Sequence, residues 1–219
     1  MTRQLRLAWP PQLDFTPESF VASGATREAR EALAGWREWP SRALALVGPE
    51  GAGKSHLAAI WAGEAGGAGE DRPVLVEDAD RTAGEGDEMA LFRLLEQAAA
   101  HEIPAVLLTA RRRPADWGVS MPDLASRLRA LAFVELEAPD DAALSQILRK
   151  LLRDRHLRVD DRVIDYVVKR IERSAPAARR AADLLDRAAS EQGRNVTMRL
   201  ASEVFAAGEF ETDDEGLSA

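Results

Sequence analysis

Residues 48–55 read Gly-Pro-Glu-Gly-Ala-Gly-Lys-Ser and lie between the apolar run 44–47 and a run of helix-forming residues, 57–61. The loop matches the phosphate-binding pattern G-x-x-x-x-G-K-[ST] in the strand–loop–helix context that the pattern requires. The alternative is a glycine-rich turn with a surface lysine. Lysine usage argues against it, because only three of the 29 basic residues are lysine and one of them stands where the pattern demands it. The loop therefore predicts a nucleotide-binding site.

The chemistry of this loop, the P-loop, assigns a role to each of its residues. Glycines without a Cβ atom let backbone N–H groups point inward, and the start of the following helix adds positive potential. Lys54 would reach the β- and γ-phosphates, and the Ser55 hydroxyl would bind Mg²⁺. The expected ligand is ADP or ATP with Mg²⁺. The expected contacts from the loop are Gly48, Gly51, Ala52, Gly53, Lys54, Ser55 and His56.

Composition limits the class of protein. A chain of 219 residues suits one domain, or one domain with a small appendage. The formal charge of −8 provides no overall attraction for nucleic acid, and no apolar run has the length of a membrane span. The absence of cysteine excludes disulfides and thiolate metal sites and fits a cytoplasmic location. The acidic segment 208–219 is expected to be disordered.

The segment 74–78, Val-Leu-Val-Glu-Asp, predicts a buried strand that ends in two acids. Such a strand delivers a carboxylate to Mg²⁺ and a second one to the attacking water. Glu77 is assigned to the metal and Asp78 to the second place, with Asp78 and Asp80 as the alternative pair. The next apolar strand, 105–109, ends in Thr109, which could sense the γ-phosphate.

The spacing between loop and acid-ended strand is short. About twenty residues separate Lys54 from Glu77, whereas a further strand with its own crossover helix needs at least ~10–12 residues beyond the P-loop helix. Either the sheet lacks one strand, or 74–76 is its second strand and the acid-ended strand comes later. Because the strand 105–109 ends without an acid, the missing strand is the preferred interpretation.

Helical patterns flank and follow these strands. Helices are expected at 26–36 and 87–101, and a short helix at 121–128 leads into a last strand, 133–136. After that strand only helices are expected: from Asp140, from Asp160, from near Pro176 to Gly193, and over 198–207. The fold class is thus an α/β nucleotide-binding core, 13–138, followed by an all-helical lid, 139–207.

The N-terminal segment 1–12 carries Gln4-Leu5-Arg6-Leu7. Glutamine followed by spaced leucines resembles peptides that dock on bacterial sliding clamps, with Gln4, Leu5 and Leu7 as the contacts. The alternative is a flexible arm without a partner. Further along, Phe20-Val21 precedes the first strand, and Val21 would pack on the adenine or else staple a helix to the sheet.

Taken together, these motifs resemble the AAA+ ATPases, and within them the Hda-type regulatory inactivators of the replication initiator DnaA. The resemblance spans nearly the whole chain. DnaA itself would continue with a helix-turn-helix domain, whereas only a short acidic tail follows here. The resemblance implies a nucleotide-bound protein on the DNA-loaded sliding clamp that stimulates hydrolysis of DnaA-bound ATP and represses re-initiation. DNA would be contacted only indirectly, no membrane is involved, and a homo-oligomer stays open.

Two arginines receive roles through this resemblance. Arg127, in Leu-Ala-Ser-Arg-Leu before the last core strand, would reach the nucleotide site of a neighbouring subunit as an arginine finger; otherwise it is a surface arginine. Arg179 in the lid would contact the chain's own nucleotide, with Arg180 and Arg173 as alternatives.

Some residues depart from the family pattern. Glu77 replaces the usual aspartate, and Arg111 replaces the usual acid near the sensing strand. These departures imply weak or absent intrinsic ATPase activity. The triple arginine 111–113 is interpreted as a phosphate or partner patch, or as a solvated turn. A small AAA+ ATPase or loader acting on DNA or a helicase is the alternative function. A P-loop nucleotide kinase is disfavoured by the all-helical C-terminal part.

Overall fold

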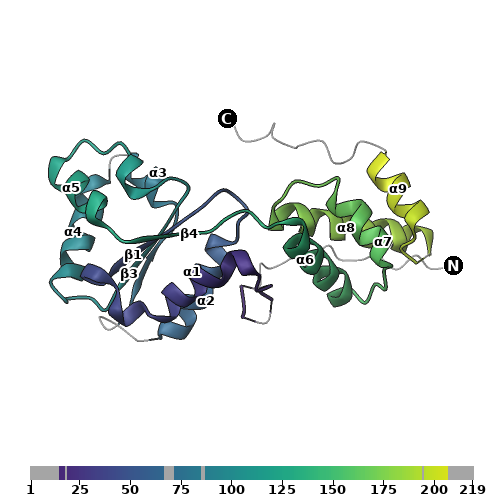
Figure 1. Ribbon diagram of the computed structural model, residues 1–219, viewed down its shortest axis with the longest axis horizontal. Helices are drawn as coiled ribbons and strands as arrows, with labels where there is room; N and C mark the ends of the chain where they lie inside the picture. Colours follow the sequence, from purple (N-terminus) through teal and green to yellow (C-terminus); the bar gives the residue numbers. More distant parts are fainter. Residues whose placement is uncertain (1–14, 18, 67–71, 85–86, 194, 207–219) are drawn as a thin grey trace, which may run out of the picture.

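The computed structural model describes residues 15–17, 19–66, 72–84, 87–193 and 195–206, which form an α/β lobe and a helical lobe (Figure 1). The predicted clamp contacts Gln4, Leu5 and Leu7 and the acidic segment 208–219 lie outside the described residues. Among the helices that are described, none is long and apolar enough to cross a membrane.

The α/β lobe is built on a parallel sheet whose described strands number four, in the order β2-β3-β1-β4. The strands are β1 (Ala43–Val47), β2 (Val74–Val76), β3 (Val106–Ala110) and β4 (Phe133–Glu135). The acid-ended strand β2 pairs directly with β3, with Val74 opposite Val106. The prediction of a parallel sheet short of one strand is therefore confirmed for the described part of the chain. Because parallel strands end at the same edge, the P-loop and the segments after β2 and β3 meet there.

Helices cover both faces of this sheet, and strand β1 shows why. Its side chains alternate, so Leu44 and Leu46 enter one core while Ala43, Ala45 and Val47 enter the other. The first core is closed by α1 (Arg27–Ala34) and α2 (Lys54–Ala65). The second is closed by α3 (Ala79–Gly84), α4 (Glu88–Ala99) and α5 (Pro122–Ala130).

Two local differences from the sequence pattern occur in this lobe. The helix predicted at 26–36 is divided into a 3-10 turn (Gly24–Thr26), α1, and a second turn (Trp36–Glu38), because Gly35 ends α1. The short helix α3 was not expected, and it begins directly after the acid-ended strand. Further 3-10 turns cover Pro40–Arg42 and Pro114–Asp116.

All four helices predicted after residue 139 are present: α6 (Asp141–Asp154), α7 (Asp161–Val168), α8 (Ala175–Gln192) and α9 (Met198–Ala206). Side chains cap three of them. Asp140 accepts a hydrogen bond from the Ala143 N–H at 2.7 Å, and Asp160 and Ser174 cap α7 and α8 in the same way. The helices enclose a separate apolar core that includes Leu148 and Leu185.

Candidate functional site

The P-loop has the backbone conformation of a phosphate cradle. Gly51 and Gly53 adopt left-handed φ angles of 74° and 99°, which favour glycine. A Cβ atom at Gly48 would lie 2.2 Å from the Leu136 carbonyl oxygen, so only glycine fits there as well. Helix α2 begins at Lys54, so its first N–H groups face the loop. The sequence motif therefore folds into a shape that can surround a phosphate.

Lys54 is held at the centre of this cradle. Its Nζ donates hydrogen bonds to the carbonyl oxygens of Gly48 and Pro49, both at 2.8 Å, and the side chain is buried. Burial lowers the pKa of Lys54 below its usual value of 10.5, and the Asp78 carboxylate is the strongest of the charges that oppose this shift. The charged ammonium is therefore incompletely compensated, and an anionic phosphate beside it would stabilise the charged form.

The ends of β2 and β3 bring two predicted residues together. The Asp78 N–H donates a hydrogen bond to Thr109 Oγ1 at 3.0 Å, and Thr109 is buried. Glu77 is exposed, whereas Asp78 is half-buried and adopts a left-handed φ of 48°. Asp80 is buried and accepts a hydrogen bond from the Arg111 N–H at 3.1 Å. Of the three acids, Asp78 thus has the closest electrostatic link to Lys54, and Asp80 supports the segment after β3.

A cavity of about 240 Å³ lies beside the P-loop, between the two lobes. Its apolar walls include Phe20, Pro139, Ile147 and Leu151, which suit the faces of a planar base. Six residues assigned to the nucleotide from sequence line it: Val21, Gly51, Ala52, Gly53, His56 and Arg179. Residues far apart in the chain therefore share one site.

The lid touches the P-loop directly at this cavity. The Ala175 N–H, in the first turn of α8, donates a hydrogen bond to the Gly51 carbonyl oxygen at 3.1 Å. Gly51 is packed so closely that a Cβ atom there would lie 2.5 Å from Ser174 Cβ. The start of α8, which carries Arg179 toward the cavity, is thus positioned by the phosphate cradle itself.

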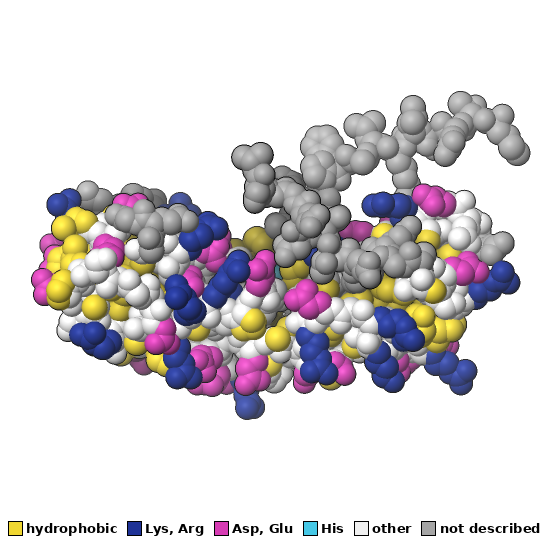
Figure 2. All heavy atoms as spheres, turned by 90° about the horizontal axis from the view of Figure 1, so that it is seen from above, with side chains coloured by type: hydrophobic (Ala, Val, Ile, Leu, Met, Phe, Trp, Pro, Cys, Tyr) yellow, Lys and Arg dark blue, Asp and Glu magenta, His cyan; other side chains and the backbone are white. Residues whose placement is uncertain are grey.

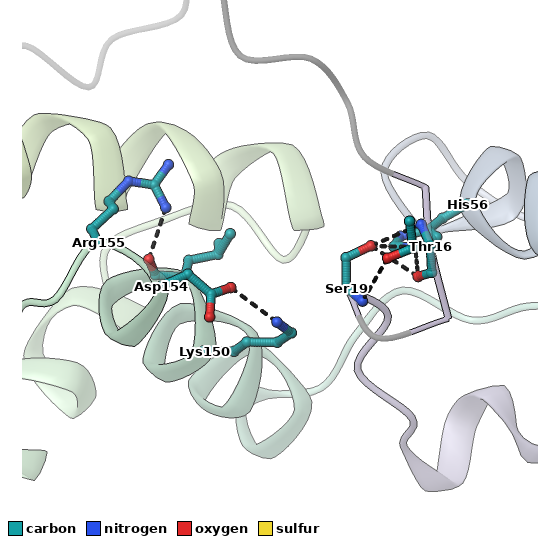
Figure 3. Close-up of polar contacts among 7 residues, drawn as sticks. Thr16, Ser19, His56, Lys150, Asp154 and Arg155 are labelled. Carbon is teal, nitrogen blue, oxygen red and sulfur yellow. Dashed lines mark hydrogen bonds and ion pairs between the residues drawn. The ribbon is translucent and has the colours of Figure 1, made fainter.

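His56 forms the wall on the side of the α/β lobe (Figure 3). Its Nε2 lies 3.0 Å from the Thr16 carbonyl oxygen, which can only accept, so this nitrogen carries a proton and donates. Ser19 Oγ lies 3.1 Å from the same nitrogen. Burial lowers the pKa of His56 below 6.5, the Thr16 hydrogen bond opposes that shift, and the nearby charge of Arg179 adds to it. His56 is therefore a neutral, oriented ring facing the lid arginine.

The opposite wall comes from α6 and was missed by the sequence analysis. Lys150 Nζ is 2.9 Å from Asp154 Oδ2, and the Arg155 guanidinium donates to the Leu151 carbonyl oxygen at 2.8 Å (Figure 3). In sequence, Lys150 and Asp154 form an ordinary i,i+4 pair on a lid helix. Only the fold shows that this helix face borders the cavity.

The candidate lid arginines have different surroundings. Arg179 is half-buried and lines the cavity. Arg173 forms an ion pair with Asp141 at 2.9 Å, and Arg180 lies 4.0 Å from Glu172. Of the three arginines, Arg179 is thus the one that lines the cavity, while both alternatives are exposed and paired with acids of the lid.

Arg127 lies elsewhere. It belongs to α5, which packs with α4 at the end of the α/β lobe away from the lid (Figure 1). Its NH2 group donates to Glu96 Oε1 at 3.0 Å, and its guanidinium lies 5.1 Å from the centre of the Phe92 ring. The side chain is 38% exposed. Arg127 does not line the cavity beside the chain's own P-loop, and it is accessible from outside.

Among the described residues, no three His, Asp or Glu side chains gather as a metal-binding group. The P-loop chemistry does not need such a group, because nucleotide phosphates provide much of the coordination of Mg²⁺ in P-loop proteins. Ser55 stands at the second position of α2, as that role requires.

Comparisons with known proteins identify the fold. No protein-family model matches the chain. An uncharacterized protein from Haemophilus influenzae is 26% identical over 133 residues, which cover 60% of this chain and 58% of that protein's length. Domain III of the replication initiation protein DnaA from Thermotoga maritima superimposes with a TM-score of 0.76 over 93% of this chain and all of that chain, at 19% identity. AMPPCP-bound DnaA from Aquifex aeolicus superimposes with a TM-score of 0.63 over 77% of this chain and 63% of that chain, at 18% sequence identity.

These superpositions agree with the observed topology. The chain has a DnaA-like AAA+ fold, an α/β core with a four-stranded parallel sheet in its described part, followed by helices.

Proposed function

We propose that this chain is an adenine-nucleotide-binding regulator of chromosome replication of the Hda type. In this function it binds the DNA-loaded sliding clamp, meets ATP-bound DnaA and stimulates hydrolysis of that ATP, which represses re-initiation. The observation that carries the proposal is the separation of two features. One is a nucleotide cavity closed by the lid, and the other is an arginine on a distant, accessible edge of the same lobe.

The nucleotide would occupy the cavity with its phosphates in the P-loop. The AMPPCP bound to a DnaA of the same fold supports an adenine nucleotide. Phe20, Val21 and Leu151 in the cavity would offer apolar contacts to the base, and Arg179 in the same lining would offer charge to the phosphates. Lys54, held inside the P-loop, would supply a second positive charge. Mg²⁺ would be held by Ser55. The sequence pattern assigns Glu77 to the metal, and Asp78 is the acid whose charge acts on Lys54.

The same features argue for a weak intrinsic ATPase. Glu77 is exposed, and Arg111 stands after β3 where the family pattern has an acid. Asp78 is then the carboxylate with the strongest effect on the pKa of Lys54. Nucleotide binding needs only the cradle and the cavity, so the chain can hold a nucleotide without turning it over efficiently. Its activity would then be exerted on the partner's ATP.

Arg127 would act as the finger in trans. A guanidinium offers a planar set of donors and a permanent charge to phosphate oxygens that gain negative charge in the transition state. Its partial exposure lets it reach a neighbouring subunit. Its ion pair with Glu96 is exposed on both sides, so releasing it costs little. Glu96 then holds the arginine ready until a partner phosphate replaces the carboxylate.

Contact with the clamp is assigned to Gln4, Leu5 and Leu7 on the sequence pattern. DNA would be reached through the clamp. On the face shown in Figure 2, basic and acidic side chains are interspersed over both lobes and do not form one basic stripe. A homo-oligomer that uses the same edge as the DnaA contact is compatible with this function.

The test is hydrolysis by ATP-loaded DnaA in the presence of clamp on DNA. Arg127→Ala should lose the stimulation, which for an arginine finger amounts to about 10³–10⁵ in rate, while keeping nucleotide and clamp binding. Lysine should rescue poorly, because a point charge cannot reproduce the planar fork. Arg129→Ala is the matched control, since Arg129 is an exposed arginine of the same helix. Equal rates for wild type and Arg127→Ala at equal clamp occupancy would contradict the finger role.

Nucleotide binding needs its own test. Lys54→Ala should copurify with less adenine nucleotide than wild type, and equal content would contradict the assignment of the site. The alternative function, a small loader acting on DNA or a helicase, predicts DNA- or helicase-stimulated turnover by the chain itself. It also predicts that Gln4→Ala has no effect on clamp pull-down.

A further inference from the structure

An ion pair between Arg111 and Glu50 links the P-loop to the segment that follows β3. Arg111, the first residue after β3, places NH1 3.0 Å from Oε2 of Glu50. Glu50 is the P-loop residue between Pro49 and Gly51, and its side chain is exposed. We call the paired groups of Glu50 and Arg111 the rim of the phosphate cradle. The pair thus joins the end of the strand that carries Thr109 to the loop expected to hold the β- and γ-phosphates.

The backbone below this pair is fixed, whereas the charged groups are free to exchange. Buried Asp80 accepts the Arg111 N–H at 3.1 Å, and Thr109, two residues earlier, is anchored by the Asp78 N–H. The two paired side chains are 55% and 75% exposed. Exposed ion pairs are weak, while guanidinium–phosphate contacts are charge-assisted and frequently bidentate. A phosphate group brought to this rim can therefore take the guanidinium from Glu50.

Both charges also act on the central ammonium. Arg111 lowers the pKa of Lys54 and Glu50 raises it, so the two side chains are electrostatically coupled to the group that binds the β- and γ-phosphates. A carboxylate on the rim repels an additional phosphate, and an arginine beside it attracts one. ADP and ATP differ by that phosphate alone.

We propose that Arg111 and Glu50 form a discriminator for the terminal phosphate, acting within the chain. Glu50 holds the Arg111 guanidinium when the bound nucleotide lacks a γ-phosphate, and the γ-phosphate takes over the guanidinium when it is present. Glu50 therefore shifts the resting ligand toward ADP, and Arg111 is the residue that makes ATP acceptable. This inference rests on the adenine-nucleotide site of the proposed function.

The test compares ADP with AMPPCP, a non-hydrolysable ATP analogue, by calorimetric titration of the full chain. Arg111→Gln should weaken AMPPCP binding on the order of tenfold, the loss expected for one charge-assisted hydrogen bond, and leave ADP binding within about twofold. Glu50→Gln should tighten AMPPCP binding and leave ADP binding unchanged. Arg199→Gln is the matched control, because Arg199 also forms an exposed pair with a glutamate, Glu203, at 2.8 Å, but within the lid helix α9.

The possible outcomes distinguish a failure of the Arg111–Glu50 discriminator from a failure of the proposed nucleotide-binding function. If wild type binds ADP but the ratio of the two affinities is the same in wild type, Arg111→Gln and Glu50→Gln, the discriminator is refuted and the nucleotide site stands. If the two variants change only the melting temperature, the pair is structural and the inference also fails. If wild type binds neither nucleotide, the proposed function fails as well.

Discussion

Replacing Gly51 with alanine tests whether the lid rests on the phosphate cradle. Gly51 has a φ of 74°, its carbonyl oxygen accepts the Ala175 N–H, and an added Cβ would lie 2.5 Å from Ser174 Cβ. Carbon atoms in contact settle at ~3.5–4.0 Å. The start of α8 would therefore have to move by about 1 Å or more, and Arg179 would move with it.

The size of the effect can be worked out in two parts. An alanine in the left-handed region costs about 1–2 kcal/mol, and the lost hydrogen bond adds about 0.5–1.5 kcal/mol. At about 2–4 °C per kcal/mol for a chain of this length, the melting temperature should fall by roughly 3–14 °C. Nucleotide affinity is the sharper measure. If Arg179 loses one charge-assisted hydrogen bond, about 1.5–3 kcal/mol, binding weakens about 10- to 150-fold.

Two further variants make the comparison specific. Gly118 has a φ of 69°, and a Cβ there meets no described atom within 4 Å, so Gly118→Ala carries the backbone cost alone and should keep full affinity. Ser174→Gly removes the clashing Cβ atom and costs the α8 cap only a few tenths of a kcal/mol. Added to Gly51→Ala, it should restore part of the affinity. The reasoning is refuted if Gly51→Ala binds mant-ADP as tightly as Gly118→Ala does.

Three other perturbations have signs that follow from the structure. The pKa of His56 is lowered from 6.5, so the unfolded chain takes up a proton at a higher pH than the folded chain does. The free energy of unfolding should therefore fall as the pH drops through 6.5 toward the lowered value. Urea titrations at several pH values should show a smaller fall for His56→Gln than for wild type. Asp140→Ala removes the side-chain cap from the N–H of the buried residue Ala143. Chemical denaturation should show a loss of about 0.5–2 kcal/mol in the free energy of unfolding. An unchanged free energy would contradict the role of Asp140 as a cap. Thr109→Val keeps the side-chain volume nearly constant and leaves the Asp78 N–H without its acceptor. Chemical denaturation should show a loss of about 1–3 kcal/mol in the free energy of unfolding. No loss would mean that water replaces the hydroxyl.

The sequence by itself determined most of the helices and strands and the position of the P-loop. The P-loop pattern located a strand at 44–47 and a helix that begins at Lys54, because glycine and lysine spacing is tied to phosphate geometry. The structure has these elements as β1 and α2. Apolar periodicity and the capping residues Asp140 and Asp160 located the lid helices, since those signals are local. The short interval before Glu77 indicated a missing strand, because chain length limits what can fit there.

Tertiary structure alone decided which side chains meet. Glu77 and Asp78 are neighbours in sequence, yet the turn at Asp78 leaves one exposed and couples the other to Lys54. Lys150 borders the cavity and Glu50 meets Arg111 only because parallel strands end at one edge and the lid closes on it. Such contacts depend on the packing of segments far apart in the chain. A local pattern records a residue's own backbone preference and carries no information about its distant partner.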